Sequence, residues 1–272
     1  MRQPWERAGR LPALRRLRER LRGRADAALS DTWLYSRLIA MQVRAQAQYK
    51  VSLGIDIGTY LLVTTLEFTA LFIFFGNFPT LLGWSVGQVA LLYALTSLGF
   101  GLAEMIGAGI DRFDEIIRLG EFDRVLLRPA GAFIQTAGSD FRLRRLGRLM
   151  QGALAFVVAL RLLPPQHWGV SQWACILVAI FSGCVIFLSV MLLGATLCFW
   201  TVETTELTNV LTYGGREMLS WPFTIYNQTF QRFFLFVVPL AFGAYVPVCY
   251  LLGRPLPFGL PPAAAFAAPL VA

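Results

Sequence analysis

The chain has 272 residues, of which 56% are hydrophobic, 14% aromatic and only 15% charged. These proportions lie outside the usual range of a soluble domain, and the apolar residues fall in long runs. Several runs approach the roughly 20 residues that an α-helix needs to cross about 30 Å of hydrocarbon. The composition therefore predicts an all-α polytopic membrane protein with roughly six membrane segments, and it excludes a soluble domain.

The net charge of +8 comes from two clusters: residues 1–50 hold 12 of the 24 arginine and lysine residues, and residues 110–148 hold 8. Membrane proteins concentrate basic residues in their cytoplasmic segments. The clustering therefore predicts a cytoplasmic N-terminus and a cytoplasmic 110–148 segment. Nucleic acid would also be attracted by this charge, but the distribution argues against nucleic acid as a partner.

Residues 1–30 are predicted to form a basic cytoplasmic N-terminal extension. Leu14, Leu17 and Leu21 recur at helical spacing between arginines, which suits an amphipathic helix on an anionic leaflet. A disordered basic tail fits the sequence equally well. Ser30 and Asp31 offer an N-cap for a second helix at about 31–50, which keeps one apolar face and is predicted to lie in the membrane interface.

The spans follow in order. They are predicted at about 51–75, 86–109, 146–163, 172–197 and 199–221, the last being imperfect and broken near Gly214 and Gly215. Prolines then recur within apolar sequence, and frequent breaks at membrane depth are tolerated where backbone is buried in protein or lines a cavity. We therefore expect re-entrant helices on the outer side over 223–252. The final run, 258–272, is predicted to be a partial last span, because 15 residues cross a bilayer poorly.

Ionisable residues inside these runs are costly in hydrocarbon and are therefore candidates for the translocation path. The candidates are Asp56, Glu67, Glu104, Glu203, Glu206, Arg216 and Glu217. A structural alternative places Asp56 near the inner interface and turns Glu67 towards a helix partner. Glu203 and Glu206 stand at i, i+3 like a catalytic acid pair, but a helix end near the cytoplasmic surface is the favoured interpretation.

The stretch Ile110–Pro129 interrupts the apolar runs with two short amphipathic pieces. Phe113 and Ile117 share a helical face in the first piece, and Phe122 begins the second after a break at Gly120. Pro129 ends the second piece, since proline restricts the residue before it and lacks a donor. A segment that is apolar on one side and charged on the other predicts a surface that docks on another protein.

Several chemistries are missing. The single histidine, His167, and four scattered cysteines give no zinc spacing, no disulfide framework and no Ser-His-Asp arrangement. A P-loop needs a lysine after a glycine-rich loop, and the only lysine is Lys50 in QYKVS. We therefore expect no catalytic residue, no metal site and no cofactor on this chain, and an energy source in an ion gradient or another subunit.

Three stretches carry a family resemblance: GEFDRVLLRP (120–129), FWTVETTELTNVLTYGGREMLSWPFTIY (199–226) and FVVPLAFGAYVP (236–247). They resemble the permease subunits of type 2 ABC exporters, in particular a bacterial branch of uncharacterised transport systems. The resemblance extends over roughly residues 35–270.

This resemblance implies a transmembrane permease domain over 31–272 with six spans, in the bacterial cytoplasmic (inner) membrane. It also implies two copies of an ABC ATPase, which would bind ATP and magnesium, and a second permease in a homodimer or heterodimer. The docking residues carried over by position are Asp111, Phe113, Asp114, Ile117, Gly120, Phe122, Asp123, Arg128 and Pro129.

Two departures from the family pattern stand out. Residues 1–30 look like an extension, and the sequence stops at APLVA about where the last helix of the family would begin, so that either the chain is truncated or its sixth span is short. The leading hypothesis is an exporter permease without enzymatic activity of its own. The alternatives are an ion-coupled secondary transporter or channel using Asp56, Glu67 and Glu104, and a membrane enzyme or assembly factor.

Overall fold

A computed structural model describes residues 33–128, 131–165, 168–201 and 205–271. No β-strand occurs in these ranges, so the all-α prediction is confirmed for them. Three described helices are long and apolar enough to cross a membrane: α3 (Lys50–Asn77), α4 (Val86–Ile106) and α9 (Val170–Leu197). A fourth, α8 (Leu146–Leu162), has 17 residues, at the lower limit for a span. The total of six segments stays a prediction, and the predicted N-terminal extension lies outside the described residues.

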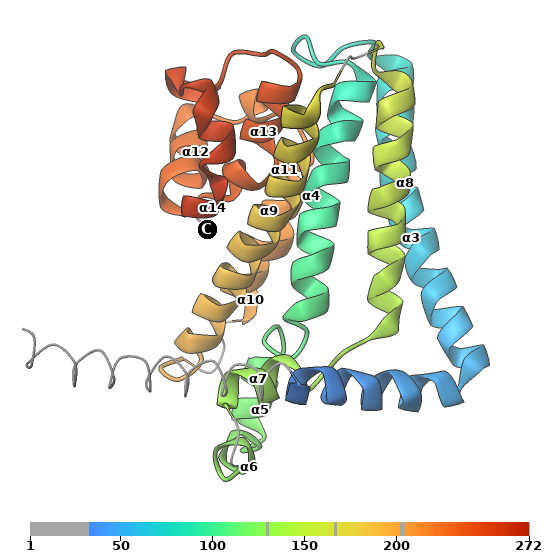
Figure 1. Ribbon diagram of the computed structural model, residues 1–272, viewed down its shortest axis with the longest axis vertical. Helices are drawn as coiled ribbons and strands as arrows, with labels where there is room; N and C mark the ends of the chain where they lie inside the picture. Colours follow the sequence, from blue (N-terminus) through green and yellow to red (C-terminus); the bar gives the residue numbers. More distant parts are fainter. Residues whose placement is uncertain (1–32, 129–130, 166–167, 202–204, 272) are drawn as a thin grey trace, which may run out of the picture.

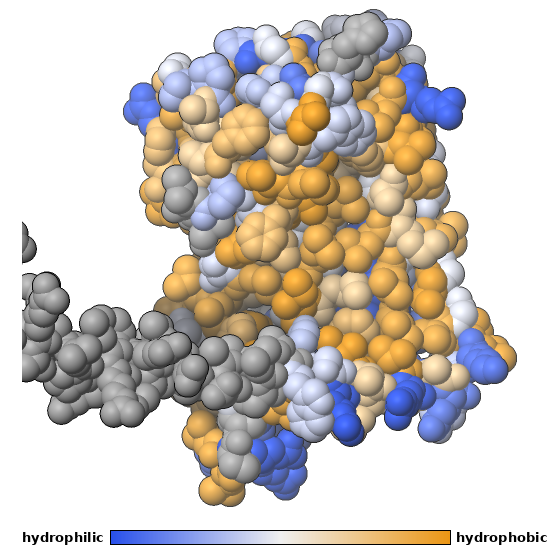
Figure 2. Space-filling view, viewed as in Figure 1, coloured by the Kyte–Doolittle hydropathy of each residue, from blue (hydrophilic) through white to orange (hydrophobic). Residues whose placement is uncertain are grey.

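The four long helices run side by side, and a helix over residues 33–48 lies across one of their ends (Figure 1). The same end carries the short elements α5 (Phe113–Arg118), α6 (Phe122–Leu126), α7 (Ala132–Ala137) and η1 (Leu143–Arg145). We call it the basic end. Figure 2 shows apolar side chains over the spans and hydrophilic side chains gathered at the basic end. The crosswise helix is the element predicted to be interfacial.

Helix α4 is the centre of the bundle. In its most apolar stretch 78% of the residues are buried, against 17% for α3. Small residues bring α4 close to its neighbours: a Cβ on Gly101 would lie 3.0 Å from Leu149 of α8, and one on Gly99 would lie 3.4 Å from the backbone of Gly183 in α9. Close backbone approach through small residues is the usual way for helices to pack in a membrane. Gly99 and Gly101 therefore serve close packing between α4 and its neighbours.

The structure differs from the sequence prediction at Gly214 and Gly215. The chain is helical through them, as α10 (Thr205–Asn209), the π-helical η2 (Val210–Gly214) and α11 (Gly215–Leu219). Both glycines keep ordinary right-handed helical angles. A Cβ on Gly215 would lie 2.7 Å from Leu240 Cδ1, so this glycine permits close packing and causes no break.

Short helical segments fill the end opposite the basic end (Figure 1). They are η3 (Phe223–Ile225), α12 (Gln228–Arg232), η4 (Phe233–Val237), η5 (Leu240–Gly243), α13 (Tyr245–Leu251), η6 (Pro257–Gly259), η7 (Pro262–Phe266) and α14 (Ala268–Val271). The last three replace the single partial span predicted over 258–272, because Pro257, Pro261 and Pro262 interrupt the helix. The re-entrant arrangement of 223–252 stays a prediction.

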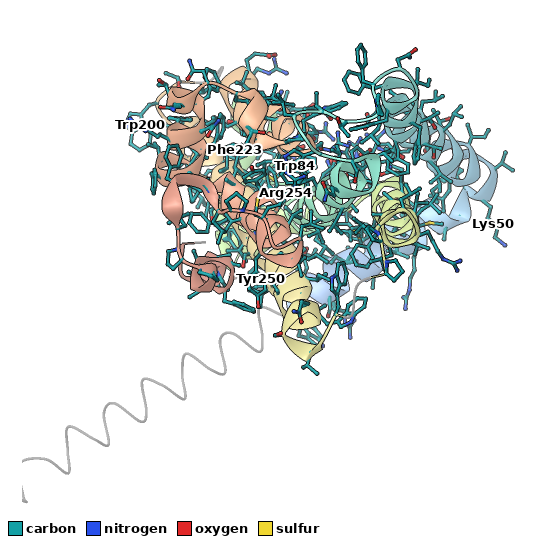
Figure 3. All side chains as sticks on the ribbon, turned by 90° about the horizontal axis from the view of Figure 1, so that it is seen from above. Lys50, Trp84, Trp200, Phe223, Tyr250 and Arg254 are labelled. Atoms are coloured by element: carbon teal, nitrogen blue, oxygen red, sulfur yellow. The ribbon has the colours of Figure 1, made fainter. Side chains whose placement is uncertain are left out.

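An aromatic cluster joins these segments to the turn before α4. The Tyr245 ring lies 5.8 Å from the Trp84 ring and 5.1 Å from the Phe223 ring, measured between centroids. The Arg254 guanidinium stacks over Trp84 at 4.2 Å from the ring centroid. Figure 3, seen along the bundle, places Trp84, Phe223 and Arg254 together near the middle of the molecule. The C-terminal segments are thus fixed to the long helices at this end.

Candidate functional site

The tip, which we define as residues 113–128, is the outermost part of the basic end (Figure 1). It consists of α5 and α6, joined through Gly120 at φ +69°, a left-handed conformation that glycine adopts without steric cost. Three leucines of the tip are exposed to solvent: Leu119 at 61%, Leu126 at 59% and Leu127 at 86%. This exposed apolar surface lies among charged side chains, which is the composition expected of a docking surface.

Three phenylalanines anchor the tip to the bundle. Phe113 of α5 and Phe122 of α6 meet edge to face at 5.1 Å between centroids. Each ring also lies 5.5 Å from the ring of Phe199, which follows the end of α9. Edge-to-face pairs at this spacing stabilise beyond the area they bury. The tip is therefore packed directly against the end of α9.

Ion pairs hold the base of the tip. Arg112 pairs with Glu115 and, at 3.1 Å, with Asp140, which also accepts from Arg142 at 2.9 Å. Burial alone would raise the pKa of Asp140, but the hydrogen bonds from Arg142 and Arg112 outweigh it and hold this pKa below its ordinary value. Asp140 therefore stays ionised and joins both ends of the 112–142 segment.

A charged groove of about 470 Å³ lies beside this base. Arg112, Glu115, Glu121, Arg124, Arg128 and Asp140 supply its charged lining. Asp123 lies nearby on the exposed part of α6. A partner that docks here meets both signs of charge together with the exposed leucines.

The predicted docking residues divide into two sets. Asp123 and Arg128 are exposed, and Gly120 makes the turn between the two helices. Phe113 is buried, Ile117 and Phe122 pack partly against the core, and Asp114 lines a small pocket beside Asp111. The buried set attaches the tip to the spans, a division that the sequence did not show. Pro129 lies outside the described residues.

A second group of polar side chains, the basic-end cluster, lies directly above the tip. It consists of Tyr60, Glu104, Asp111, Arg145, Arg148 and Tyr213. Glu104 forms an ion pair with Arg148 at 3.3 Å and lies 3.7 Å from Arg145, which in turn lies 3.5 Å from Asp111. All four charged side chains are 6–12% exposed. The cluster thus balances two buried acids with two buried arginines.

Two glycines give these long side chains their room. A Cβ on Gly101 would lie 3.6 Å from Arg148 Cγ, and one on Gly147 would lie 3.2 Å from the Tyr60 ring. Arg148 reaches Tyr60, donating to its hydroxyl at 2.8 Å, and also stacks over Phe100.

Burial raises the pKa of the Asp111 carboxyl, and Arg145 and Tyr213 offset part of this rise.

A third group, the Arg216 group, consists of Glu67, Tyr93, Arg216 and Glu217. On α3, Glu67 lies about two helical turns after Tyr60 of the basic-end cluster. Arg216 of α11 donates to Glu67 of α3 at 3.0 Å and to the Tyr93 hydroxyl at 3.2 Å, and it pairs with Glu217. Arg216 is buried, whereas the side chains of Glu67 and Glu217 are 38% and 57% exposed. The structure thus shows Glu67 facing a helix partner, the structural alternative considered for it.

The remaining path candidates lie apart from these groups. Asp56 is exposed on α3 and Glu206 is exposed on α10, while Glu203 lies outside the described residues. Among the described residues no group of three or more His, Cys, Asp or Glu side chains could hold a metal ion. The chemistry assembled here is ion pairing and hydrogen bonding between helices.

Sequence reasoning missed Tyr60, Tyr93, Arg145, Arg148, Phe199 and Tyr213. Arg145 and Arg148 were counted as cytoplasmic charge. Their i, i+3 spacing at the start of a span and the presence of Glu104 inside another span were the available signals. An acid in a span needs a partner, and two arginines on one helix face near a span's beginning are suited to provide it.

The profile described as ABC-2 family transporter protein matches residues 61–272, which include α4, the tip, the C-terminal segments and every residue of the basic-end cluster except Tyr60. No curated protein and no solved structure matches the chain significantly. Because the family profile covers most of the chain, the chain belongs to the ABC-2 family of transporter proteins and is a membrane permease component of an ABC transporter.

Proposed function

We propose that this permease is part of an ATP-driven exporter and that its tip is the surface on which the ABC ATPase docks. Membership of the family implies an ABC ATPase as partner. The observation that carries the proposal is the construction of the tip: α6 exposes leucines and charges outward, while Phe113 and Phe122 attach it to the bundle. An element that binds on one side and is anchored on the other is suited to transmit movement.

The basic end would then face the cytoplasm. It carries the crosswise 33–48 helix and the arginines of 110–148, in keeping with the concentration of basic residues on the cytoplasmic side of membrane proteins. The ATPase acts in the cytoplasm, where ATP is available. We therefore place this subunit in the bacterial cytoplasmic membrane with its N-terminus inside.

The path candidates support transport between two permease subunits. Glu67 and Glu217 are partly exposed on the outside of this chain, and half-exposed carboxylates inside a membrane need water or a polar partner. A second permease, identical or different, would provide both by enclosing a hydrated path. In this arrangement Arg216, Glu67 and Glu217 lie along the path.

Ion-coupled transport is the weaker candidate. It would need carboxylates that bind and release an ion or a proton, yet Glu104 is compensated by two buried arginines and Glu67 by Arg216. Only Asp56 and Glu206 are exposed without such compensation among the described candidates. Carboxylates that are already paired with arginines are poorly suited to bind and release an ion.

The docking proposal is tested on the exposed and the anchoring parts of the tip separately. Asp123→Lys reverses an exposed charge and should weaken binding of the partner ABC ATPase by roughly ten-fold. Phe122→Ala removes the aromatic anchor and should lower ATP hydrolysis by the assembled complex while the ATPase still binds. Binding is measured on purified permease in nanodiscs, and hydrolysis by phosphate release.

Arg161→Ala is the matched control, because Arg161 is exposed on α8 away from the tip. Membrane insertion should be unchanged in all three variants. ATPase binding that is equally tight for wild type, Asp123→Lys and Phe122→Ala, together with full ATP hydrolysis, would show that the ATPase docks elsewhere.

A further inference from the structure

The Tyr213 hydroxyl lies between two carboxylates. It is 3.1 Å from Asp111 Oδ2 and 3.4 Å from Glu104 Oε1. A tyrosine hydroxyl has one hydrogen, so it donates to one carboxylate at a time, and an ionised carboxylate offers no hydrogen in return. The shorter distance favours Asp111 in this structure. The two acceptors therefore compete for a single donor.

The three groups belong to different parts of the molecule. Asp111 is in the loop that leads from α4 into the tip, two residues before Phe113. Glu104 is on α4, at the centre of the bundle. Tyr213 is on η2, the π-helical turn between α10 and α11, and such turns occur frequently at functional sites. A change of acceptor would thus transfer the hydrogen bond of the 205–219 segment from the tip loop to α4.

The surroundings allow this exchange without an unpaired charge. Arg145 contacts both carboxylates and donates to the backbone oxygen of Glu104. It therefore compensates whichever acid loses the tyrosine hydrogen. Glu104 also accepts from the Tyr60 hydroxyl at 3.3 Å and forms an ion pair with Arg148. Each acid therefore keeps an arginine beside it in either arrangement.

Packing keeps the Tyr213 ring in place. The ring meets Phe100 of α4 edge to face at 5.2 Å between centroids. With the ring fixed, small displacements of the Asp111 loop decide which carboxylate is nearer, since the two distances differ by only a few tenths of an ångström. A single donor between two acceptors can adopt two discrete arrangements, and coupling between distant sites requires an element of this kind.

We propose that Tyr213 is a positioning residue that acts as a hydrogen-bond switch, bonding the 205–219 segment to the tip loop through Asp111 or to α4 through Glu104. The proposal rests on the proposed function of the tip as the ATPase docking surface. Movement of the docked tip draws Asp111 away, and the hydroxyl then bonds Glu104. The 205–219 segment, which carries Arg216 of the path, thereby senses the state of the ATPase.

The test is hydrogen exchange of the complete complex with its ATPase, in nanodiscs of phosphatidylethanolamine and phosphatidylglycerol, with and without ATP and orthovanadate. In the wild type, nucleotide should change the exchange of both the tip and residues 205–219. Tyr213→Phe keeps the ring on Phe100 and removes the hydroxyl. It should leave the tip response intact and reduce the 205–219 response at least about ten-fold, the effect expected for one hydrogen bond to a charged group.

Tyr226→Phe is the matched control, because its hydroxyl bonds the Met218 backbone at the end of the same segment and no group of the tip. It should keep both responses. Glu104→Gln removes the competing charged acceptor and should hold residues 205–219 in the nucleotide-free pattern.

The outcomes separate the two proposals. A wild-type tip that does not respond to nucleotide contradicts the docking function. A responding tip with an unchanged 205–219 response in Tyr213→Phe overturns the switch and leaves the docking function standing. Equal loss of the response in Tyr213→Phe and Tyr226→Phe also overturns the switch, because it would reflect a general loosening of the segment.

Discussion

The basic-end cluster and the Arg216 group are both built from arginines and acids between helices, yet they differ in exposure. In the basic-end cluster the four charged side chains are 6–12% exposed. In the Arg216 group the arginine is 4% exposed, whereas its two acids are 38% and 57% exposed. The charges of the basic-end cluster are enclosed and balanced within this chain. The two acids of the Arg216 group are exposed on its surface.

The two groups therefore meet different physical requirements. A fully enclosed set of ion pairs contributes orientation and a defined helix arrangement, and breaking it leaves an uncompensated buried charge. A half-exposed carboxylate within a span has to face water or a polar partner. Both acids are predicted as path residues, and of the two Glu67 has the partly exposed carboxylate, whereas Glu104 is enclosed within this chain.

The largest effect is expected from Arg148→Ala. It leaves Glu104 buried with a weaker set of partners, and removal of one member of a buried pair costs about 3–5 kcal/mol. The thermal unfolding of purified protein in detergent should shift strongly downwards. Arg161→Ala on the same helix, where the arginine is exposed, should change it little. Similar shifts for both variants would mean that the basic-end cluster is not energetically enclosed.

A smaller effect is expected from Arg216→Ala. Because Glu67 and Glu217 remain partly exposed, the free energy of unfolding should fall by about 1.5–3 kcal/mol, the range for a hydrogen bond to a charged group. A double-mutant cycle with Glu67→Gln measures the interaction directly, and we expect the two substitutions to be non-additive. Strict additivity would show that Arg216 does not stabilise Glu67.

The smallest effect is expected at Asp140, outside the spans. Its lowered pKa means that its ion pairs stabilise the fold at pH values above the ordinary aspartate pKa of about 4, and that this stabilisation is lost as pH falls through the lowered pKa. Asp140→Asn should be less stable than wild type at pH 6. The difference should narrow steadily between about pH 4 and pH 3 in melting curves. A difference that is constant over this range would exclude the ion-pair contribution.

The long apolar elements could be predicted from sequence because their signal is local. Runs such as Val170–Leu197 report helix and burial residue by residue. The role of each glycine could not be predicted in this way. Gly101, Gly147 and Gly215 look alike in the sequence, yet each accommodates a different neighbour. At Gly214 and Gly215 the sequence predicts a break, whereas the structure is helical. What a glycine accommodates depends on a chain segment far away in sequence.

Dependence on segments far away in sequence also decided which parts of the site could be predicted. The tip could be predicted because its amphipathic faces and its Gly120 turn are local features. The basic-end cluster could not, because Tyr60, Glu104, Arg148 and Tyr213 come from four separate helices. The position of Glu104 inside an apolar run indicated that its charge is costly in hydrocarbon, but gave no information on its partners. Pairing across more than forty residues is a tertiary property.

Helix α3 has 28 residues, which at 1.5 Å per residue is about 42 Å, more than the roughly 30 Å of a hydrocarbon core. It is bonded to the bundle through Tyr60 at the basic-end cluster and through Glu67 at the Arg216 group, and most of its remaining surface is open. A helix longer than the bilayer accommodates the mismatch by tilting. A change in bilayer thickness is therefore expected to act on α3 and, through it, on the contacts of Tyr60 and Glu67, so that lipid composition would enter the energetics of this transporter.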